Sequence, residues 1–381
     1  MERMNRELPY IIATVTNDLY QDQRMQRICT TLQDAGYRVE LTGRRRRGST
    51  SLPPQAYEQT RLRCWFERGK LFYLEYNLRL LLYLLGRPFD AVCAVDSDTL
   101  VACFVAARIK GKPCVLDAHE YFSETPEVAQ RPIVKTIWEA VARWIIPLLR
   151  HCYTVGEALA EVLSKRYGVD FETIRNAPLK QVAPAPSSVV HSDRPFIVLY
   201  QGMLNAGRGL EAMLEAMQAL EDVQLWLAGE GDLSEELRRQ AQTLIGQDKV
   251  RFLGFVPPAE LPQLTSQAHI GINLLEAGSL SYWYSLANKA LDYIHAGVPS
   301  IQMDFPEYGK INEKWEVFTC ISDLSPGAIA AAVRALQQDR DKYEWMQQQC
   351  AIATNELCWQ NEAPKLLNLY ERVFRKHADR R

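Results

Sequence analysis

The chain has 381 residues, of which 47% are apolar and 24% are charged, a composition typical of a folded globular protein and not of a disordered or fibrous one. Its length predicts two domains. Lysine and arginine together number 44 and aspartate and glutamate 46, so the net charge of -2 excludes the overall basic field of a nucleic-acid-binding protein.

The cysteines and the apolar stretches indicate the cell compartment. Nine cysteines are spread singly without a C-x-x-C pair, which indicates neither a disulfide framework nor a zinc site. The first residues lack the apolar core and cleavage site of a signal peptide. The most apolar stretch, 71–85, is interrupted by polar residues and is shorter than the roughly 20 residues that span a bilayer. We expect a cytoplasmic protein, or one peripheral on the inner face of the membrane.

Short β-branched runs alternate with helical patterns along the chain, which is typical of βαβ units. In the first half we expect strands at 10–15, 38–42, 91–95, 113–116, 151–155 and 172–175. A helix at 25–35 ends at Gly36, a residue favoured at helix C-termini. A second series follows at 196–201, 223–228, 250–253, 269–274 and 298–302.

Between the two series, residues 177–195 contain four prolines and no periodicity, which indicates a linker. The sequence therefore predicts an α/β protein with two Rossmann-like, doubly wound domains facing across a cleft. The bounds we expect are 1–180 for the first domain, 181–195 for the linker, 196–360 for the second domain and 361–381 for a final helix. In such sheets ligands bind beyond the carboxyl ends of the strands.

The loop after the expected strand 196–201 is rich in glycine. Gly202, Gly207 and Gly209 precede a helix, where backbone N–H groups can approach a phosphate and Arg208 adds a charge. The alternative is a plain tight turn. The loop after strand 223–228, with Gly229 and Glu230, can also contact a nucleotide through its backbone, although by itself it favours a structural turn.

Residues 288–297 predict a helix that ends at Gly297 and begins with charged and polar side chains. Lys289 lies near its start and can reach a phosphate, while Asp292, about one turn later, can accept hydrogen bonds from two sugar hydroxyls. This pair suits a nucleotide sugar. The alternative is a surface Lys–Asp pair, which contributes about 0.3–0.5 kcal/mol.

Two loops of the first half carry candidate polar residues. His119 and Glu120 follow strand 113–116, where a histidine can donate to a sugar hydroxyl or support proton transfer, the alternative being a structural histidine. Asp96 and Asp98 follow strand 91–95 and either bind an acceptor hydroxyl or cap the next helix, and capping is the interpretation we favour.

A basic segment at 44–70 holds eight basic and two acidic residues, a net charge of +6. The apolar stretch 71–85 follows it, and the expected helix 134–149 carries two tryptophans. Basic residues beside aromatic and aliphatic side chains favour an anionic membrane surface. We expect peripheral contact through Arg44, Arg45, Arg46 and Arg47, with a solvated loop as the alternative.

Six motifs occur in a characteristic order: LDAHEYF (116–122), IRNAP (174–178), LYQGMLNAGRGLEAMLEA (199–216), LAGEGD (227–232), FLGFVP (252–257) and SLANKALDYIHAGVPSI (285–301). This order resembles that of the GT-B glycosyltransferases, particularly the family-4 retaining nucleotide-sugar transferases. The resemblance covers nearly the whole chain. Its most specific part is NKxxDYxxAGxP, which is close to a family consensus at the donor site.

The resemblance implies that the C-terminal domain holds the nucleotide sugar, that the N-terminal domain offers the acceptor, and that the final helix crosses back onto the first domain. Arg208 and Lys289 would neutralise the diphosphate, Asp292 would bind the ribose, and His119 would face the transferred sugar. The implied residues are His119, Arg208 and Lys289 for catalysis, Gly202, Gly207, Arg208, Gly229, Glu230, Tyr284, Asn288, Lys289 and Asp292 for the donor, and Asp98, His119 and Glu120 for the acceptor.

Two departures from the family pattern concern the donor site. The family has an arginine directly after the first glycine and a lysine five residues later, whereas this chain has Met203 and then Arg208. The family's E-x7-E motif falls on Tyr284 and Asp292, with Glu276 farther upstream. These differences leave the donor open and also allow a weakened or inactive enzyme.

We expect a retaining, metal-independent transferase of a hexose or N-acetylhexosamine, acting in cell-surface polysaccharide or glycoconjugate synthesis on a glycan or lipid-linked acceptor. We expect a UDP- or GDP-linked donor and no cofactor. The D-x-D match at 96–98 is discounted as a metal site because it lies in the expected acceptor domain. One alternative is a catalytically silent partner subunit, but the presence of all four residues Arg208, Lys289, Asp292 and His119 argues against it. The other is a nucleotide-sugar epimerase, which needs no acceptor.

Overall fold

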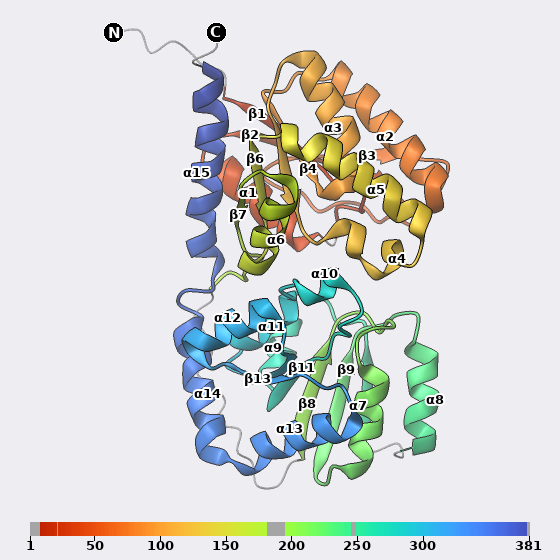
Figure 1. Ribbon diagram of the computed structural model, residues 1–381, viewed down its shortest axis with the longest axis vertical. Coiled ribbons are helices and arrows are strands. Elements are labelled where there is room, and N and C mark those ends of the chain that lie inside the picture. Colours follow the sequence, from red (N-terminus) through yellow and green to blue (C-terminus); the bar gives the residue numbers. More distant parts are fainter. Residues whose placement is uncertain (1–7, 21, 181–194, 245–248, 379–381) are drawn as a thin grey trace. The chain divides into compact units, whose positions relative to one another are not determined.

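The structure, a computed structural model, describes residues 8–20, 22–180, 195–244 and 249–378. The chain divides into two compact units, shown in Figure 1. Unit 1 consists of Met1–Arg175 with Glu362–Arg381, and unit 2 consists of Asn176–Asn361. Of the expected linker at 181–195, residues 181–194 lie outside the described residues.

Unit 1 is built on a seven-stranded, wholly parallel sheet in the order β3-β2-β1-β4-β5-β6-β7. Its strands are β1 (Tyr10–Thr14), β2 (Arg38–Arg45), β3 (Glu58–Arg63), β4 (Ala91–Val95), β5 (Cys114–Ala118), β6 (His151–Thr154) and β7 (Phe171–Thr173). The sequence pattern misses β3, because this edge strand is half-exposed and its residues, EQTRLR, lack an apolar run.

Helices cover this sheet, as Figure 1 shows. They are α1 (Gln23–Asp34), α2 (Gly69–Gly86), α3 (Asp96–Lys110), α4 (Pro126–Ala129), α5 (Pro132–Ile145) and α6 (Glu157–Tyr167), with the short 3-10 helices η1 (Phe122–Glu124) and η2 (Ile146–Leu148). The final helix, α15 (Trp359–Ala378), packs on unit 1, where the Phe374 ring stacks on Tyr37 with ring centroids 5.4 Å apart.

Unit 2 contains a six-stranded parallel sheet in the order β10-β9-β8-β11-β12-β13. Its strands are β8 (Phe196–Gln201), β9 (Val223–Ala228), β10 (Val250–Gly254), β11 (Ile270–Asn273), β12 (Ser300–Met303) and β13 (Phe318–Ile321). Its helices are α7 (Leu210–Ala216), η3 (Met217–Ala219), α8 (Ser234–Leu244), α9 (Leu261–Thr265), α10 (Leu280–Trp283), α11 (Asn288–His295), α12 (Pro306–Trp315), α13 (Pro326–Gln338) and α14 (Arg340–Ala353). The pattern misses β13, a four-residue edge strand of which only Phe318 is fully buried.

The predicted α/β class with two doubly wound sheets is confirmed. In each sheet the chain builds outward on one side and then continues on the other, so the strand order reverses between β1 and β4 in unit 1 and between β8 and β11 in unit 2. The loops that leave the carboxyl ends of strands at such a reversal diverge and form a ligand crevice. The candidate residues follow β4, β5, β8, β9 and β11 and lie at these edges.

Candidate functional site

The loops after β8 and β9 in unit 2 touch each other backbone to backbone. Gly202 N donates a hydrogen bond to Ala228 O at 2.9 Å. At Gly229 the backbone φ is +146°, and an ideal β-carbon there would lie 1.9 Å from Gly202 O, so only glycine fits. Leu204 N donates to Glu230 O at 3.2 Å. The two glycine-rich loops therefore form one continuous edge at the carboxyl end of the sheet.

Glu230 contributes to this edge through its backbone. Its carboxylate instead forms an ion pair with Arg238 of α8, with Nη2 to Oε1 at 2.7 Å. This hydrogen bond lowers the pKa of Glu230. The Glu230 carboxylate therefore already has a partner on α8, and a contact of this loop with a nucleotide stays a prediction.

Lys289 in the first turn of α11 is the central cation of unit 2. Its side chain is buried, with 8% exposure, and its Nζ lies 4.0 Å from the centroid of the Tyr200 ring. An ideal β-carbon at Gly202 would lie 3.3 Å from Nζ, so the ammonium adjoins the glycine edge. Burial lowers the pKa of Lys289 well below its usual range, Arg208 lowers it further, and Asp292 opposes them. The alternative of an exposed Lys–Asp surface pair is wrong, because Lys289 is buried.

Arg208 brings a second positive charge to the same edge. Its guanidinium carbon lies 5.0 Å from the centroid of the Tyr282 ring. Its Nε is buried and has no hydrogen-bond partner among the described residues. Within the residues that the structure describes, no carboxylate forms an ion pair with Arg208 or with Lys289. Two cations that rest on aromatic rings instead of carboxylates make this edge suited to an anion.

Asp292, one turn further along α11, is held by a polar side chain at the end of β8. Gln201 Nε2 donates to Asp292 Oδ2 at 3.0 Å, and Thr265 donates to Gln201 Oε1 at 2.8 Å. These bonds fix the carboxylate at the carboxyl end of β8. Asn288 is exposed, and its Oδ1 accepts a hydrogen bond from Asn176 at 2.7 Å.

Glu276, not Tyr284, is the group that the structure places beside the glycine-rich loop. Glu276 N donates to Gly207 O at 3.1 Å. An ideal β-carbon at Gly207 would lie 4.0 Å from Glu276 Oε2. Tyr284 is half-buried and follows the last residue of α10, where its backbone N donates to Leu280 O. Counting from Asp292 cannot identify Glu276, because the loop after β11 changes the spacing.

His119 in unit 1 is held by two carboxylates. Its Nε2 lies 3.0 Å from Asp117 Oδ2, and its backbone N donates to Asp96 Oδ1 at 2.7 Å. Asp117 is completely buried and accepts two hydrogen bonds from Arg24, whose Nη2 lies 2.7 Å from Oδ1. The sequence reasoning missed Arg24 and Asp117, since 93 residues separate them.

These charges set the protonation of His119. Burial raises the pKa of Asp117, but Arg24 and His119 outweigh it and lower this pKa to about 2. Burial lowers the pKa of His119, but the charges of Asp117 and Asp96 outweigh it and raise this pKa to about 9. His119 is therefore protonated at neutral pH. Its Nδ1 lies 3.9 Å from Asp96 Oδ2, which leaves the Nδ1–H group to donate to a substrate.

Asp96 and Asp98 do not cap α3 in the predicted way, and that interpretation is wrong. The N-cap position is Val95, while Asp96 is the first helical residue and has a φ of +56°. The Asp96 side chain turns to His119, and Thr16 Oγ1 donates to Asp98 Oδ2 at 2.5 Å. Burial and the charge of Asp96 raise the pKa of Asp98 to about 7.

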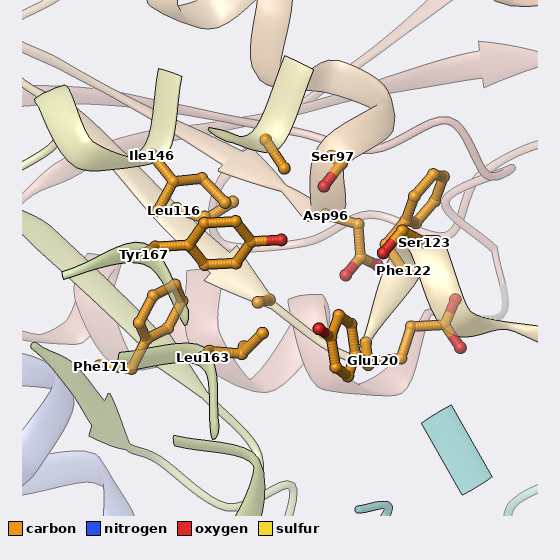
Figure 2. A pocket seen from close by; sticks show the side chains of 13 residues that line it. Asp96, Ser97, Leu116, Glu120, Phe122, Ser123, Ile146, Leu163, Tyr167 and Phe171 are labelled. Carbon is orange, nitrogen blue, oxygen red and sulfur yellow. The ribbon is translucent and has the colours of Figure 1, made fainter. Parts of the chain in front are cut away.

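A pocket lies at the carboxyl end of β5 (Figure 2), where Ala118 and Glu120 line it but His119 does not. Figure 2 shows the polar side chains of Asp96 and Glu120 on one side and the apolar side chains of Ile146, Leu163 and Phe171 on the other. Glu120, expected at the acceptor site, lines this pocket, whereas Asp98 is not among its lining residues. The pocket has a free volume of about 20 Å³, which is room for little more than one water molecule.

The structure changes the prediction for the basic segment. Arg44 is buried, with its guanidinium carbon 4.0 Å from the Phe72 ring centroid and Nη1 donating to Glu67 O at 2.9 Å. The predicted membrane contact is therefore wrong for Arg44, since packing against α2 removes it from the surface. Arg45, Arg46 and Arg47 are exposed. No helix of the described ranges combines the length and the apolar character that crossing a bilayer requires.

Comparison with known proteins defines the family. Residues 22–178 match the family described as Glycosyltransferase Family 4, and residues 185–351 match the family described as Glycosyl transferases group 1. Together with the two parallel sheets, these matches show that the chain belongs to the GT-B glycosyltransferases of the family-4 type.

Several individual proteins are similar to this chain in sequence or in structure. A phosphatidyl-myo-inositol mannosyltransferase of Mycobacterium leprae is 26% identical over 264 residues, 65% of this chain and 68% of that protein. A sucrose-phosphate synthase from Thermosynechococcus elongatus has a similar structure, with a TM-score of 0.80 at 16% identity over 97% of this chain and all of the other. HepE of Anabaena in complex with UDP gives a TM-score of 0.73 at 14% identity over 96% of this chain and 100% of that one.

Gly229→Ala tests the contact between the two glycine-rich loops. The added methyl meets Gly202 O and the backbone φ is unfavourable for alanine, so we expect a loss of more than about 1 kcal/mol in the free energy of unfolding. Urea denaturation measures it. Gly278→Ala is the matched control, because a β-carbon there meets nothing within 4 Å. Equal stability of the two variants would show that the loops are not in contact.

Asp96→Asn tests the electrostatics of His119. Removal of one negative charge should lower the pKa of His119 below about 9, measured by NMR titration of its ring. Because folding raises this pKa from its usual 6.5, His119 adds stability that is full below pH 6.5 and is lost as pH rises through 9. Between pH 6.5 and 9, the variant should therefore lose less stability than the native protein does. Asp90→Asn, which breaks the ion pair with Lys112, is the control, and an unchanged His119 pKa in Asp96→Asn contradicts the account.

Proposed function

We propose that this chain is an active, retaining glycosyltransferase that acts without a metal. It takes a hexosyl or N-acetylhexosaminyl group from a UDP- or GDP-linked donor. It transfers this group to a glycan or lipid-linked acceptor in the synthesis of cell-surface polysaccharides or glycoconjugates. The observation that carries the proposal is the pair of cations, Lys289 and Arg208, beside the glycine-rich loops of unit 2.

The cations match the charge that develops in the reaction. When the bond between the sugar and the nucleoside diphosphate breaks, the departing oxygen gains negative charge. Lys289 is buried, so its interaction with that charge is screened little by water. Arg208 presents a guanidinium, which can bind two phosphate oxygens at once. These two side chains supply the stabilisation that a metal ion supplies in other phosphate chemistry.

The neighbouring polar groups fit the rest of a nucleotide sugar. Asp292, held by Gln201, accepts hydrogen bonds from the two ribose hydroxyls. In unit 1 the protonated His119 donates from Nδ1 to a sugar hydroxyl. A protonated histidine is not a base at neutral pH, which supports a retaining reaction in which the departing phosphate takes the proton of the acceptor.

The relatives support the choice of donor and acceptor. HepE of Anabaena binds UDP, which favours a UDP-linked donor over other bases. The name of the Mycobacterium leprae relative indicates that it transfers mannose to a phosphatidylinositol, which favours a lipid-linked acceptor.

Lys289→Ala and Arg208→Ala test the donor site. A hydrogen bond to a charged group contributes about 1.5–3 kcal/mol, so each variant should bind the nucleoside diphosphate about 10 to 100 times more weakly. Calorimetric titration with UDP, GDP, ADP, CMP and dTDP, with and without EDTA, measures this. Lys342→Ala, an exposed lysine of α14, is the matched control.

Three results separate the alternatives for the donor site. Normal binding by both cation variants means that the donor-site assignment is wrong. The lack of binding of any nucleotide by the native protein favours the silent partner subunit. Binding that EDTA abolishes contradicts the proposed independence of metal.

His119→Ala tests the division of roles between the units. We expect unchanged affinity for the nucleoside diphosphate, because this side chain belongs to unit 1, and a lower rate of sugar transfer from the matching nucleotide sugar. Release of the nucleotide measures the rate. An unchanged rate contradicts the role of His119. Release of free nucleotide with an altered sugar and no acceptor indicates an epimerase.

A further inference from the structure

The helix α2 is apolar on two opposite sides. One side packs into the core through Phe72, Tyr76, Leu80 and Leu84. The other side consists of leucines that remain exposed: Leu71 by 49%, Leu74 by 69%, Leu78 by 57% and Leu82 by 62%. Their spacing of three and four residues puts them in one row along the helix. A row of exposed leucines on one helix indicates a binding surface, because single exposed leucines are ordinarily scattered.

The helix α5 repeats this arrangement. Ile133, Ile137 and Trp144 recur at helical spacing and are exposed by 79%, 56% and 70%. Its inner side carries Ala142 and Ile145, which are buried. Helix α5 thus has an apolar outer side that its own packing does not require.

The two helices are neighbours within unit 1. The ring of Tyr73 on α2 meets that of Trp138 on α5 edge to face, with centroids 5.5 Å apart. Both helices lie on the same side of the sheet (Figure 1). We call their exposed apolar residues, Leu71, Leu74, Leu78, Leu82, Ile133, Ile137 and Trp144, the α2–α5 surface. Trp65, which precedes α2 and is 81% exposed, adds a further aromatic side chain next to it.

Positive charge flanks this surface. Arg68 and Lys70 at the start of α2 and Arg131 at the start of α5 are exposed and form no ion pair with the described residues. The exposed arginines at the end of β2 lie nearby, since Arg47 N donates to Glu67 Oε1 at 3.3 Å.

The neighbouring carboxylates are largely neutralised. Glu75 pairs with Arg79 at 2.7 Å and also accepts hydrogen bonds from two backbone N–H groups, those of Trp65 and Phe66. Glu139 pairs with Arg166 at 3.0 Å and lies 3.6 Å from Arg143. Glu75 and Glu139 therefore leave Arg68, Lys70 and Arg131 available to an outside anion.

We propose that unit 1 docks on an anionic lipid bilayer through the α2–α5 surface. Leucine, isoleucine and tryptophan side chains enter the boundary between headgroups and acyl chains, while Arg68, Lys70 and Arg131 approach the negative headgroups. A second copy of the chain fits less well, because a two-fold contact on this surface would bring the same basic residues together. The proposal does not depend on the proposed function, although docking would place the enzyme next to a lipid-linked acceptor.

Binding of the full chain to lipid vesicles tests this proposal. The vesicles contain phosphatidylcholine alone or phosphatidylcholine mixed with phosphatidylglycerol, and sedimentation separates bound from free protein. We expect binding to the mixed vesicles that weakens with salt, and little binding to phosphatidylcholine alone. Leu74→Ser combined with Leu78→Ser should reduce the partition about tenfold or more. Arg68→Glu combined with Lys70→Glu should remove the salt-dependent part.

The control is Ile352→Ser, which changes an apolar side chain of unit 2 that is 51% exposed and should bind as the native protein does. All these positions are exposed, so circular dichroism should show native folding. The proposal is overturned if the native chain does not bind the mixed vesicles, or if the double leucine variant binds them as strongly as the native chain does. It is also overturned if the protein is a dimer that the leucine variant dissociates, since the surface then joins two copies.

Discussion

Parallel strand pairing is the constraint on which both sites depend. Because all strands of a sheet run in the same direction, their carboxyl ends share one edge, and at the reversal of strand order the loops separate there. Residues distant in sequence consequently meet: Gln201 holds Asp292 in unit 2, and Arg24 holds Asp117 in unit 1. The close contact of the loops after β8 and β9, which only glycine allows at Gly229, completes the edge on which the nucleotide is proposed to bind.

The charged side chains of the two units have different partners. In unit 1, Asp117 lies between Arg24 and His119, so the buried charges are paired and keep a histidine protonated. In unit 2, Lys289 and Arg208 rest on the rings of Tyr200 and Tyr282. Burial of a cation without a paired anion is unfavourable, and an aromatic ring offsets only part of that. In the proposed function a diphosphate supplies the missing negative charge.

Sequence patterns predict all the central strands of the two sheets and the edge strands β7 and β10. The bounds of β4, β8 and β9 agree with the prediction because these strands are mostly apolar and mostly buried. The pattern misses the other two edge strands, β3 and β13; both are half-exposed, β3 lacks an apolar run and β13 has only four residues. The two sheets and the family were thus predictable from the sequence.

The contacts within the sites were less predictable. Local spacing places Lys289 in the first turn of α11 and Asp292 about one turn later. It cannot show that Asp117 holds His119, that Glu276 lies beside Gly207, or that Arg44 packs on Phe72. These contacts join different elements and arise only from the packing of the chain.

The most direct test of the account is the pKa of the Lys289 amine, measured by NMR with labelled lysine, in the free protein and with saturating UDP or GDP. Burial and the charge of Arg208 should hold this pKa below the usual lysine range in the free protein. A bound diphosphate should raise it, because negative charge favours the ammonium form. If nucleotide binds and the pKa does not change, the diphosphate does not lie at Lys289, and the proposed donor site is wrong.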